Sequence, residues 1–245
     1  MKLKSEQDAF GHAVWDHHHG TPAYEIIERS DGHFAISGGP AVYLDVERWG
    51  SRELAALEHA HGRVLDIGCN AGRHAVYLQQ RGLDVLGVDI SPLAIAVAKE
   101  RGLANAEVLS IDELSTELGA FDTILMLGNN FGLFGSAAKA RRLLQRFKAL
   151  TRPGATLIVE TLNVYETKDR DHLAYLAANR ARGRMSGQLR LRARYKRFVT
   201  PWFDYLMVSP AEMEALVDGT GWRVGKRYQG PGGRPVYATI IERVD

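Results

Sequence analysis

The chain has 245 residues, of which 45% are hydrophobic and 24% charged, and its formal net charge is +2. These values suit a globular protein with one large α/β domain or a core domain with appendages. Every apolar run is shorter than the ~20 residues that span a bilayer, and Met1–Phe10 is polar, so we expect neither a membrane span nor a secretory signal. A single cysteine, Cys69, excludes an internal disulfide and favours the reducing cytoplasm.

The first 60 residues combine histidines with two segments of helix-like spacing. Five of the nine histidines lie within residues 1–33: His12, His17, His18, His19 and His33. The run His17–His19 is open to three interpretations, namely a metal site, part of a substrate pocket, or a packing surface, and adjacent side chains do not easily converge on one ion. Tyr24–Ser30 and Tyr43–Leu57 space their apolar residues as amphipathic helices do. We therefore expect residues 1–60 to be a helical segment that packs on the sheet or covers a ligand.

Residues 64–72 predict a strand, a tight turn and the start of a helix. Val64–Ile67 is a short apolar run, typical of a buried strand. Gly68 and Gly72 bracket the turn, where glycine allows positive φ, and Asn70 tolerates the left-handed region better than most residues. Backbone N–H groups at the helix start would then be free to meet a polar or anionic ligand group.

The next apolar run ends in Asp89, 17 residues after Gly72. In nucleotide-binding folds an acid at this place accepts hydrogen bonds from ribose hydroxyls. The glycine spacing is D-x-G-x-N-x-G, not the dinucleotide pattern, and Asp66 before the first glycine suits a cationic ligand group better than a pyrophosphate. With these residues the sequence resembles the class I S-adenosylmethionine-dependent methyltransferases, whose usual motif is [D/E]-x-G-x-G-x-G. Asn70 replaces the middle glycine, and the resemblance is best over residues 60–160.

The resemblance implies a set of residues that bind S-adenosyl-L-methionine. Asp66 and the loop backbone would lie under the methionine part, Asp89 would hold the ribose, and Asp112 would contact the adenine amino group or else cap a helix. Ile90 and Ile111 would enclose the adenine ring. The full expected set is Asp66, Gly68, Cys69, Asn70, Gly72, Asp89, Ile90, Ile111, Asp112, Leu127 and Asn129, with no metal.

From Gly62 onward, strand and helix patterns alternate. We expect strands at 64–67, 84–89, 106–109, 121–127, 155–160, 222–228 and 235–242, and helices at 73–81, 92–101, 136–150 and 210–217. Such alternation predicts parallel βαβ units in a doubly wound sheet that is covered on both faces. The resemblance adds that the sheet has seven strands, the last pair antiparallel around the loop 230–233, and that residues 1–60 form an N-terminal helical lid. Residues 61–245 would be the core domain.

A basic insertion, residues 162–208, follows the fifth strand. Residues 166–200 hold ten Lys or Arg and only three acids. Gln188–Phe198 alternates strictly between apolar and basic residues, which predicts a half-buried strand, and Trp202–Val208 is a candidate hairpin partner. A dense basic face meets an anion or interleaves with acids. It therefore suggests an anionic acceptor, a nucleic acid, or a solvated or homodimer-contact face.

The sequence does not select a catalytic residue. Asn129 and Asn130 follow the fourth strand, where the acceptor should meet the methyl group, although Asn129 could instead orient the cofactor or cap a helix. The candidate residues are His12, His17, His18, His19, Tyr43, Asn129 and Tyr165. We expect a cytoplasmic methyltransferase that acts on N or O of a small molecule by in-line displacement. The alternatives are a nucleic-acid methyltransferase, an NAD-dependent oxidoreductase and a non-catalytic cofactor-binding scaffold.

Overall fold

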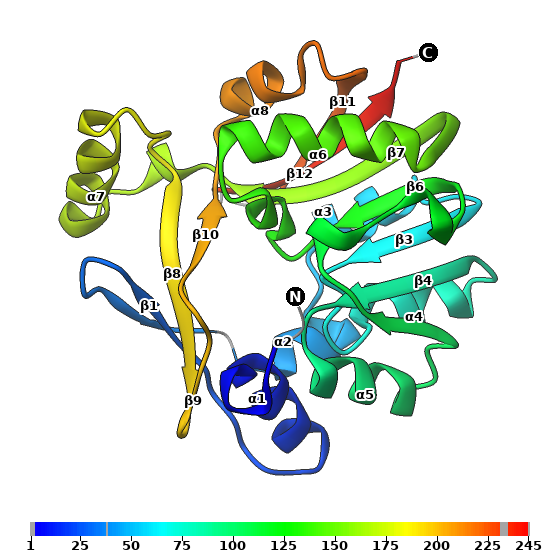
Figure 1. Ribbon diagram of the computed structural model, residues 1–245, viewed down its shortest axis with the longest axis horizontal. Coiled ribbons are helices and arrows are strands. Elements are labelled where there is room, and N and C mark those ends of the chain that lie inside the picture. The colour runs from blue at the N-terminus through cyan, green and yellow to red at the C-terminus, as the bar shows by residue number, and fades with distance from the viewer. Residues whose placement is uncertain (1–2, 38, 231–234, 245) are drawn as a thin grey trace. The chain divides into compact units, whose positions relative to one another are not determined.

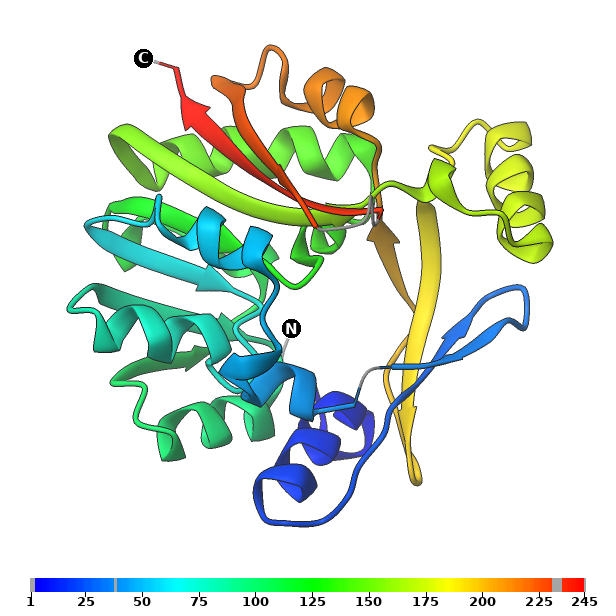
Figure 2. The ribbon, with the colours of Figure 1, turned by 180° about the vertical axis from the view of Figure 1, so that it is seen from behind.

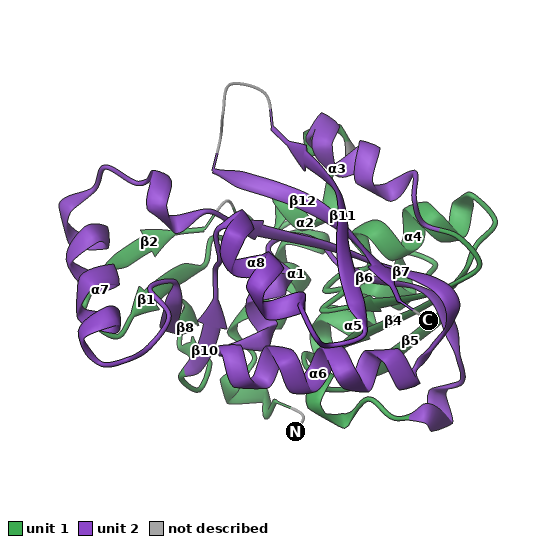
Figure 3. Ribbon diagram, turned by 90° about the horizontal axis from the view of Figure 1, so that it is seen from above, with its two compact units in different colours: residues 1–49, 61–115, 191–202 green, residues 50–60, 116–190, 203–245 purple. Residues whose placement is uncertain are grey.

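The computed structural model describes residues 3–37, 39–230 and 235–244, and it divides into two compact units (Figure 3). Unit 1 contains residues 1–49, 61–115 and 191–202, and unit 2 contains residues 50–60, 116–190 and 203–245. Most of the predicted loop 230–233 lies outside the described residues. No helix in the described ranges is long and apolar enough to cross a membrane.

Unit 1 carries the start of the chain and the first three parallel strands. Its elements are η1 (Ser5–Gln7), α1 (Ala9–His18), β1 (Ile26–Arg29), β2 (Phe34–Ile36), α2 (Ala41–Leu44), η2 (Val46–Arg48), β3 (Arg63–Ile67), α4 (Arg73–Gln80), β4 (Asp84–Asp89), α5 (Pro92–Glu100), β5 (Asn105–Val108), η3 (Ile111–Glu113) and β9 (Phe198–Val199), where η marks a 3-10 turn. β4 pairs in parallel with β3 and β5 (Figure 1). Val64–Ile67 is buried throughout, as expected for a parallel strand covered on both faces.

Unit 2 carries the remaining strands of the large sheet. Its elements are α3 (Ser51–Leu57), η4 (Thr116–Leu118), β6 (Phe121–Met126), η5 (Asn130–Phe134), α6 (Ala137–Ala149), β7 (Thr151–Leu162), η6 (Val164–Glu166), α7 (Arg170–Ala181), β10 (Phe203–Leu206), α8 (Pro210–Val217), β11 (Trp222–Gln229) and β12 (Val236–Arg243). β6 and β7 are parallel, whereas β12 is antiparallel to both β7 and β11. The strand order β11-β12-β7-β6-β3-β4-β5 confirms the predicted seven-stranded, mostly parallel sheet.

A second sheet has the order β10-β8-β1-β2, with β9 also paired to β8 (Gln188–Tyr195). β1 lies antiparallel to β8, with Ile26 opposite Arg194 and Arg29 opposite Leu191 (Figures 1 and 2). The predicted helix at 24–30 is therefore wrong, because pairing with a strand far along the chain determines its conformation. The predicted helix at 43–57 is interrupted: Asp45 and Gly50 take extended conformations, and α2 and α3 lie on either side of them.

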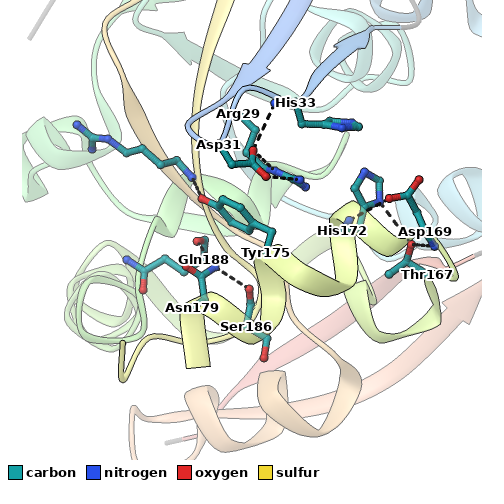
Figure 4. Close-up of polar contacts among 11 residues, drawn as sticks. Arg29, Asp31, His33, Thr167, Asp169, His172, Tyr175, Asn179, Ser186 and Gln188 are labelled. Atoms are coloured by element: carbon teal, nitrogen blue, oxygen red, sulfur yellow. Dashed lines mark hydrogen bonds and ion pairs between the residues drawn. The ribbon is translucent and has the colours of Figure 1, made fainter. Parts of the chain in front are cut away.

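The insertion contains a helix that the sequence pattern did not predict, α7. In unit 2, Asn179 donates from Nδ2 to the carbonyls of Ser186 and Gln188, both at 2.9 Å, and the Tyr175 hydroxyl accepts the Arg190 amide at 3.1 Å (Figure 4). Asn179 is buried, so these bonds fix the end of α7 against the start of β8.

Candidate active site

The loop between β3 and α4 has the conformation that its sequence predicts. The φ values are 73° at Gly68, 50° at Asn70 and 74° at Gly72. A Cβ on Gly72 would also lie 3.3 Å from the side chains of Val76 and Ala98. Glycine is therefore required at position 72 both by backbone conformation and by close packing.

The amides of this loop are all used inside the protein, so the expectation of free N–H groups there is wrong. The amides of Gly68 and Cys69 donate to the Val88 carbonyl at 2.8 and 3.1 Å. The Asn70 amide donates to Asp89 Oδ2 at 3.0 Å. The Ala71 amide donates to Asn70 Oδ1 at 2.7 Å, and the Gly72 amide to the Cys69 carbonyl at 2.8 Å. A pyrophosphate needs donors at this place, and these five amides are already engaged.

Asp66 is a buried acid in β3, immediately before the loop. The residue is 1% exposed, and its Oδ2 has no hydrogen-bond partner among the described residues. Burial raises the pKa of Asp66 to about 6, against the opposing effects of nearby His74 and a hydrogen bond from the Ala75 amide. A buried carboxylate oxygen without a partner is costly, so it indicates that a donor or cation belongs beside it.

Asp89 is the last residue of β4, and its carboxylate accepts hydrogen bonds from the β3–α4 loop and from the turn that follows β4. Its Oδ2 accepts the Asn70 amide, and its Oδ1 accepts the Ser91 amide at 2.9 Å. Burial raises the pKa of Asp89 to about 6, and the two amide hydrogen bonds oppose that rise. Each carboxylate oxygen can accept a further hydrogen bond, so these contacts leave capacity for ribose hydroxyls. The Cys69 thiol is buried, and a Cβ on Gly87 would lie 2.9 Å from its sulfur.

Asp8 connects α1 to the start of α5, a link that the sequence analysis did not identify. Its Oδ1 caps α1 by accepting the Gly11 amide at 2.9 Å, and its Oδ2 accepts the Ser91 hydroxyl at 2.8 Å. Ser91 caps α5 through the Ala94 amide at 3.0 Å, with Pro92 at the first helical position as predicted. A Cβ on Gly11 would lie 2.3 Å from both Asp8 Oδ2 and Ser91 Oγ. The sequence signal available for this link was an aspartate, Asp8, three residues before a glycine, Gly11.

Two arginines hold α2 beside the loop. Arg101 donates from Nη1 to the Ala71 carbonyl and from Nη2 to the Leu44 carbonyl at 3.1 Å. Arg73 donates to the Val42 carbonyl at 2.5 Å. Tyr43 lies between those two carbonyls in sequence and packs with Ala71 in one apolar cluster. The backbone of α2 is thus bound to the loop between β3 and α4 and to the start of α4, and the Asn70 amide of that loop donates to Asp89.

The residues expected around the adenine differ in exposure. Ile90 is 39% exposed although it is a large apolar side chain, and Ile111 is buried. Asp112 is exposed in η3, and Ser110 is the residue that caps this turn. The alternative role of Asp112 as a helix cap is therefore wrong, while its contact with adenine stays a prediction.

The candidate residues of the N-terminal segment have partners within unit 1. His12 stacks on Phe198 with ring centroids 3.5 Å apart. His18 and His19 place Nε2 3.3 and 3.4 Å from Glu100 Oε2. Burial raises the pKa of Tyr43, so its phenol stays neutral and is a poor base. These contacts favour the packing interpretation of the histidines. In the described part of the chain, no group of three or more His, Cys, Asp or Glu could hold a metal ion.

Unit 2 holds the other candidate residues. Leu127 is buried, and the Asn129 amide donates to Glu160 Oε1 at 3.2 Å while its carbonyl accepts the Tyr205 hydroxyl at 2.6 Å. The Asn129 side chain does not cap η5, and its buried Oδ1 has no partner among the described residues. Tyr165 donates to Glu212 at 2.6 Å. Their roles toward cofactor or acceptor stay predictions.

The alternating basic strand is interleaved with acids. Arg192 and Arg194 each place Nε 2.6 Å from Glu28 Oε2, and Lys196 lies 2.7 Å from Asp16. In unit 2, Arg190 lies 3.4 Å from Asp204. Leu191, Ala193 and Tyr195 are buried on the opposite face, as the alternation predicts. The four cations of the alternation thus have acidic partners, so this strand by itself gives no support to an anionic acceptor or a nucleic acid.

Comparison with known proteins finds a methyltransferase domain in this chain. Residues 64–154 match a family model described as a methyltransferase domain. Glycine N-methyltransferase from Mus musculus is 29% identical over 129 residues, which cover 45% of this chain and 44% of the relative. Ubiquinone biosynthesis O-methyltransferase from Xanthomonas oryzae pv. oryzae is 28% identical over 115 residues, covering 44% and 46%. The chain therefore spans less than half the length of these curated relatives.

A solved structure matches the whole chain. The SAM-dependent methyltransferase from Bacteroides fragilis, in complex with S-adenosyl-L-homocysteine, is 25% identical and has a TM-score of 0.84 over 100% of this chain and 98% of its own. The fold is that of the class I S-adenosylmethionine-dependent methyltransferases, and residues 64–154 match the methyltransferase domain. The cofactor of that class is S-adenosylmethionine.

Proposed function

We propose that this chain transfers the methyl group of S-adenosylmethionine to a nitrogen or oxygen atom of a small-molecule acceptor. The observation that carries the proposal is the acceptor-rich character of the site in unit 1. The five loop amides are engaged internally, whereas Asp66 presents a buried oxygen without a partner. Such a site suits the positively charged amino and sulfonium groups of S-adenosylmethionine, and suits the phosphates of a dinucleotide poorly.

In this proposal, different residues of unit 1 bind different parts of the cofactor. Asp66 receives the amino group of the methionine part, and Asp89 accepts the ribose hydroxyls with oxygens that the Asn70 and Ser91 amides hold in place. Ile90, a large apolar residue that is 39% exposed, covers one face of the adenine. When bound, the cofactor supplies an activated methyl group, and the protein aligns the acceptor for in-line displacement. Alignment of this kind contributes on the order of 7–11 kcal/mol in favourable cases.

The small-molecule acceptor is supported by the comparisons and by the second sheet. Two relatives are named for small molecules: a glycine N-methyltransferase and a ubiquinone biosynthesis O-methyltransferase. The alternating cations of β8 and Lys196 just after it, which would favour a nucleic acid, are paired with acids. Among the described residues, we find no contact that favours one of the alternative functions.

Calorimetric titration tests the proposal. S-adenosylmethionine and, separately, NADH are titrated into the wild-type protein and into the variants Asp89→Ala and Asp84→Ala. Asp84 starts the same strand at its other end and pairs with Arg63 at 3.2 Å, so it is the matched control. We expect binding of S-adenosylmethionine alone, retained in D84A and lost in D89A. Binding of NADH in its place, or equal binding by D89A, would contradict the proposal.

A further inference from the structure

Asp8 is a buried acid of unit 1 whose two oxygens contact two different helices. It is 1% exposed and directly precedes α1. Its Oδ1 accepts the Gly11 amide of α1 at 2.9 Å. Its Oδ2 accepts the Ser91 hydroxyl at 2.8 Å and the Leu93 amide at 3.4 Å, and both donors lie at the start of α5. The carboxylate therefore joins two helix starts that are far apart in the chain.

The Ser91 hydroxyl is held in one orientation by these contacts. Its single proton is donated to Asp8, and its oxygen accepts the Ala94 amide at 3.0 Å. The backbone N–H of the same residue donates to Asp89 Oδ1 at 2.9 Å. A displacement of Ser91 would thus also move a donor that orients the Asp89 carboxylate.

The segment before α1 approaches the residues after Asp89 closely. A Cβ on Gly11 would lie 2.3 Å from both Asp8 Oδ2 and Ser91 Oγ. Glycine within a helix costs ~1 kcal/mol relative to alanine, so this contact requires a residue that weakens α1. The Leu3 amide makes a second attachment, 3.3 Å from the Ile90 carbonyl. Residues 3–8 are therefore bonded to both of the residues that directly follow Asp89.

We propose that Asp8 is a positioning residue for the ribose of S-adenosylmethionine, and that it acts through Ser91 on the Asp89 carboxylate. This inference rests on the proposed function, in which Asp89 accepts the ribose hydroxyls. The Ser91 and Asn70 amides each occupy one oxygen of Asp89, so they set the direction in which its remaining lone pairs point. Hydrogen bonds weaken steeply with misalignment, so a carboxylate that turns loses affinity for both hydroxyls at once.

A pair of ligands separates positioning of the ribose from general stability. S-adenosylhomocysteine and its 2′,3′-dideoxy analogue, which lacks both ribose hydroxyls, are each titrated by calorimetry, and the ratio of the two affinities is compared between variants. A site that is merely loosened or partly unfolded binds both ligands less tightly, so its ratio does not change. The titrations are made at about pH 8, above the pKa of about 6 of Asp89. Loss of the Asp8 charge, which helps to raise that pKa, then leaves Asp89 ionised.

Two variants remove the contact from its two sides. Asp8→Ser keeps a residue that caps helices well, but it lacks the second oxygen that accepts the Ser91 hydroxyl. Ser91→Ala removes the hydroxyl itself, and it provides the same test should the first variant not fold. The matched control is Asp169→Ser, because Asp169 caps α7 in unit 2 through the His172 amide at 2.9 Å. Urea denaturation gives the stability of each variant.

We expect the wild type to bind S-adenosylhomocysteine at least about 10-fold more tightly than the analogue, which leaves a charged acceptor without its donors. D8S and S91A should each reduce this ratio by roughly 3- to 10-fold. D169S should leave it within about 2-fold of the wild-type ratio, because its site is distant and independent.

An unchanged ratio in either folded variant, D8S or S91A, would overturn the inference and leave the proposed function intact. Equal binding of the two ligands by the wild type would overturn the inference together with the ribose assignment of Asp89. Failure of the wild type to bind either ligand would overturn the proposed function as well.

Discussion

Unit 1 contains two sets of acidic side chains that differ in what surrounds the negative charge. Asp66 and Glu25 are buried and Asp89 is partly buried, none of the three has a cation bonded to it, and loss of hydration raises the pKa of each. Glu28 instead accepts hydrogen bonds chiefly from Arg192 of β8, and Asp16 chiefly from Lys196 in the turn after β8, and these lower the pKa of both acids. The two sets lie in one unit and have the same functional group, yet their pKa values move in opposite directions.

Under the proposed function, the difference separates Asp66 and Asp89, which are expected to bind a ligand, from acids that stabilise the fold. An ion pair such as Glu28 with Arg192 is complete without any other molecule. A buried acid without a cation lowers the free energy of unfolding, and a ligand that brings a donor or positive charge would offset this cost. The expected consequences are opposite for the two sets, and mutagenesis can distinguish them.

The largest expected effect is on cofactor affinity at Asp66. Asp66→Asn removes the negative charge but keeps the shape and an acceptor for the Ala75 amide. We expect S-adenosylmethionine affinity to fall roughly 10- to 100-fold, since a hydrogen bond to a charged group is worth about 1.5–3 kcal/mol. Calorimetry measures this, with Asp84→Asn as the control. Unchanged affinity would show that Asp66 is not part of the cofactor site.

The same variant should change how stability depends on pH. The pKa of Asp66 is raised from 3.8 to about 6 in the folded protein, so folding takes up a proton between these values. The stability of the wild type relative to D66N is therefore greatest below the lower value and falls as the pH rises through the upper one. We expect a loss on the order of 1–3 kcal/mol between about pH 4 and pH 7.5, measured by urea denaturation without cofactor. A difference independent of pH would contradict the raised pKa.

A smaller effect is expected at the cap that joins α1 to α5. Ser91→Ala removes the hydrogen bonds to Asp8 and to the Ala94 amide, and it should lower the free energy of unfolding by about 1–2 kcal/mol. Ser136→Ala is the matched control, because Ser136 caps α6 through the Lys139 amide at 3.3 Å. S136A should cost less, about 1 kcal/mol at most. Equal losses in the two variants would mean that the bond to Asp8 contributes nothing.

The smallest effect is expected at the paired acid Glu28. Its pKa is lowered to about 2 by Arg192 and Arg194, so its contribution to stability is present above the usual value of 4.5 and is lost as the pH falls toward 2. The wild type should unfold at a slightly higher temperature than Glu28→Gln at neutral pH, and the difference should vanish in acid. High salt should also reduce it, because the Arg194 side chain is 37% exposed. Cofactor affinity should not change; a loss there would place Glu28 in the first set.

Local patterns predicted the core of the fold well. The strands β3, β4, β6 and β12 lie within one or two residues of their predicted limits, as do α4, α5, α6 and α8. Each of these elements has a continuous apolar run or a cap signal, such as Ser91-Pro92 or the capping box at Ser209. The left-handed conformation of Asn70 also followed from residue type. These features depend on neighbours in sequence, which is why a sequence shows them.

The tertiary structure decided what depends on residues far apart in the chain. Residues 26–29 form a strand because β8 supplies their hydrogen bonds, and the spacing of Tyr24–Ser30 gives no sign of this. The loop amides are engaged because Val88 and Asp89 accept them from the next strand. Asp8 and Glu25 are distinguished in the same way: all three acids are buried, and it is the arginines bonded to Glu28, not residue type, that set Glu28 apart. The sequence by itself determined the βαβ order, the glycine loop and the acid at the end of β4, and long-range packing alone decided which acids are paired with cations and which are not.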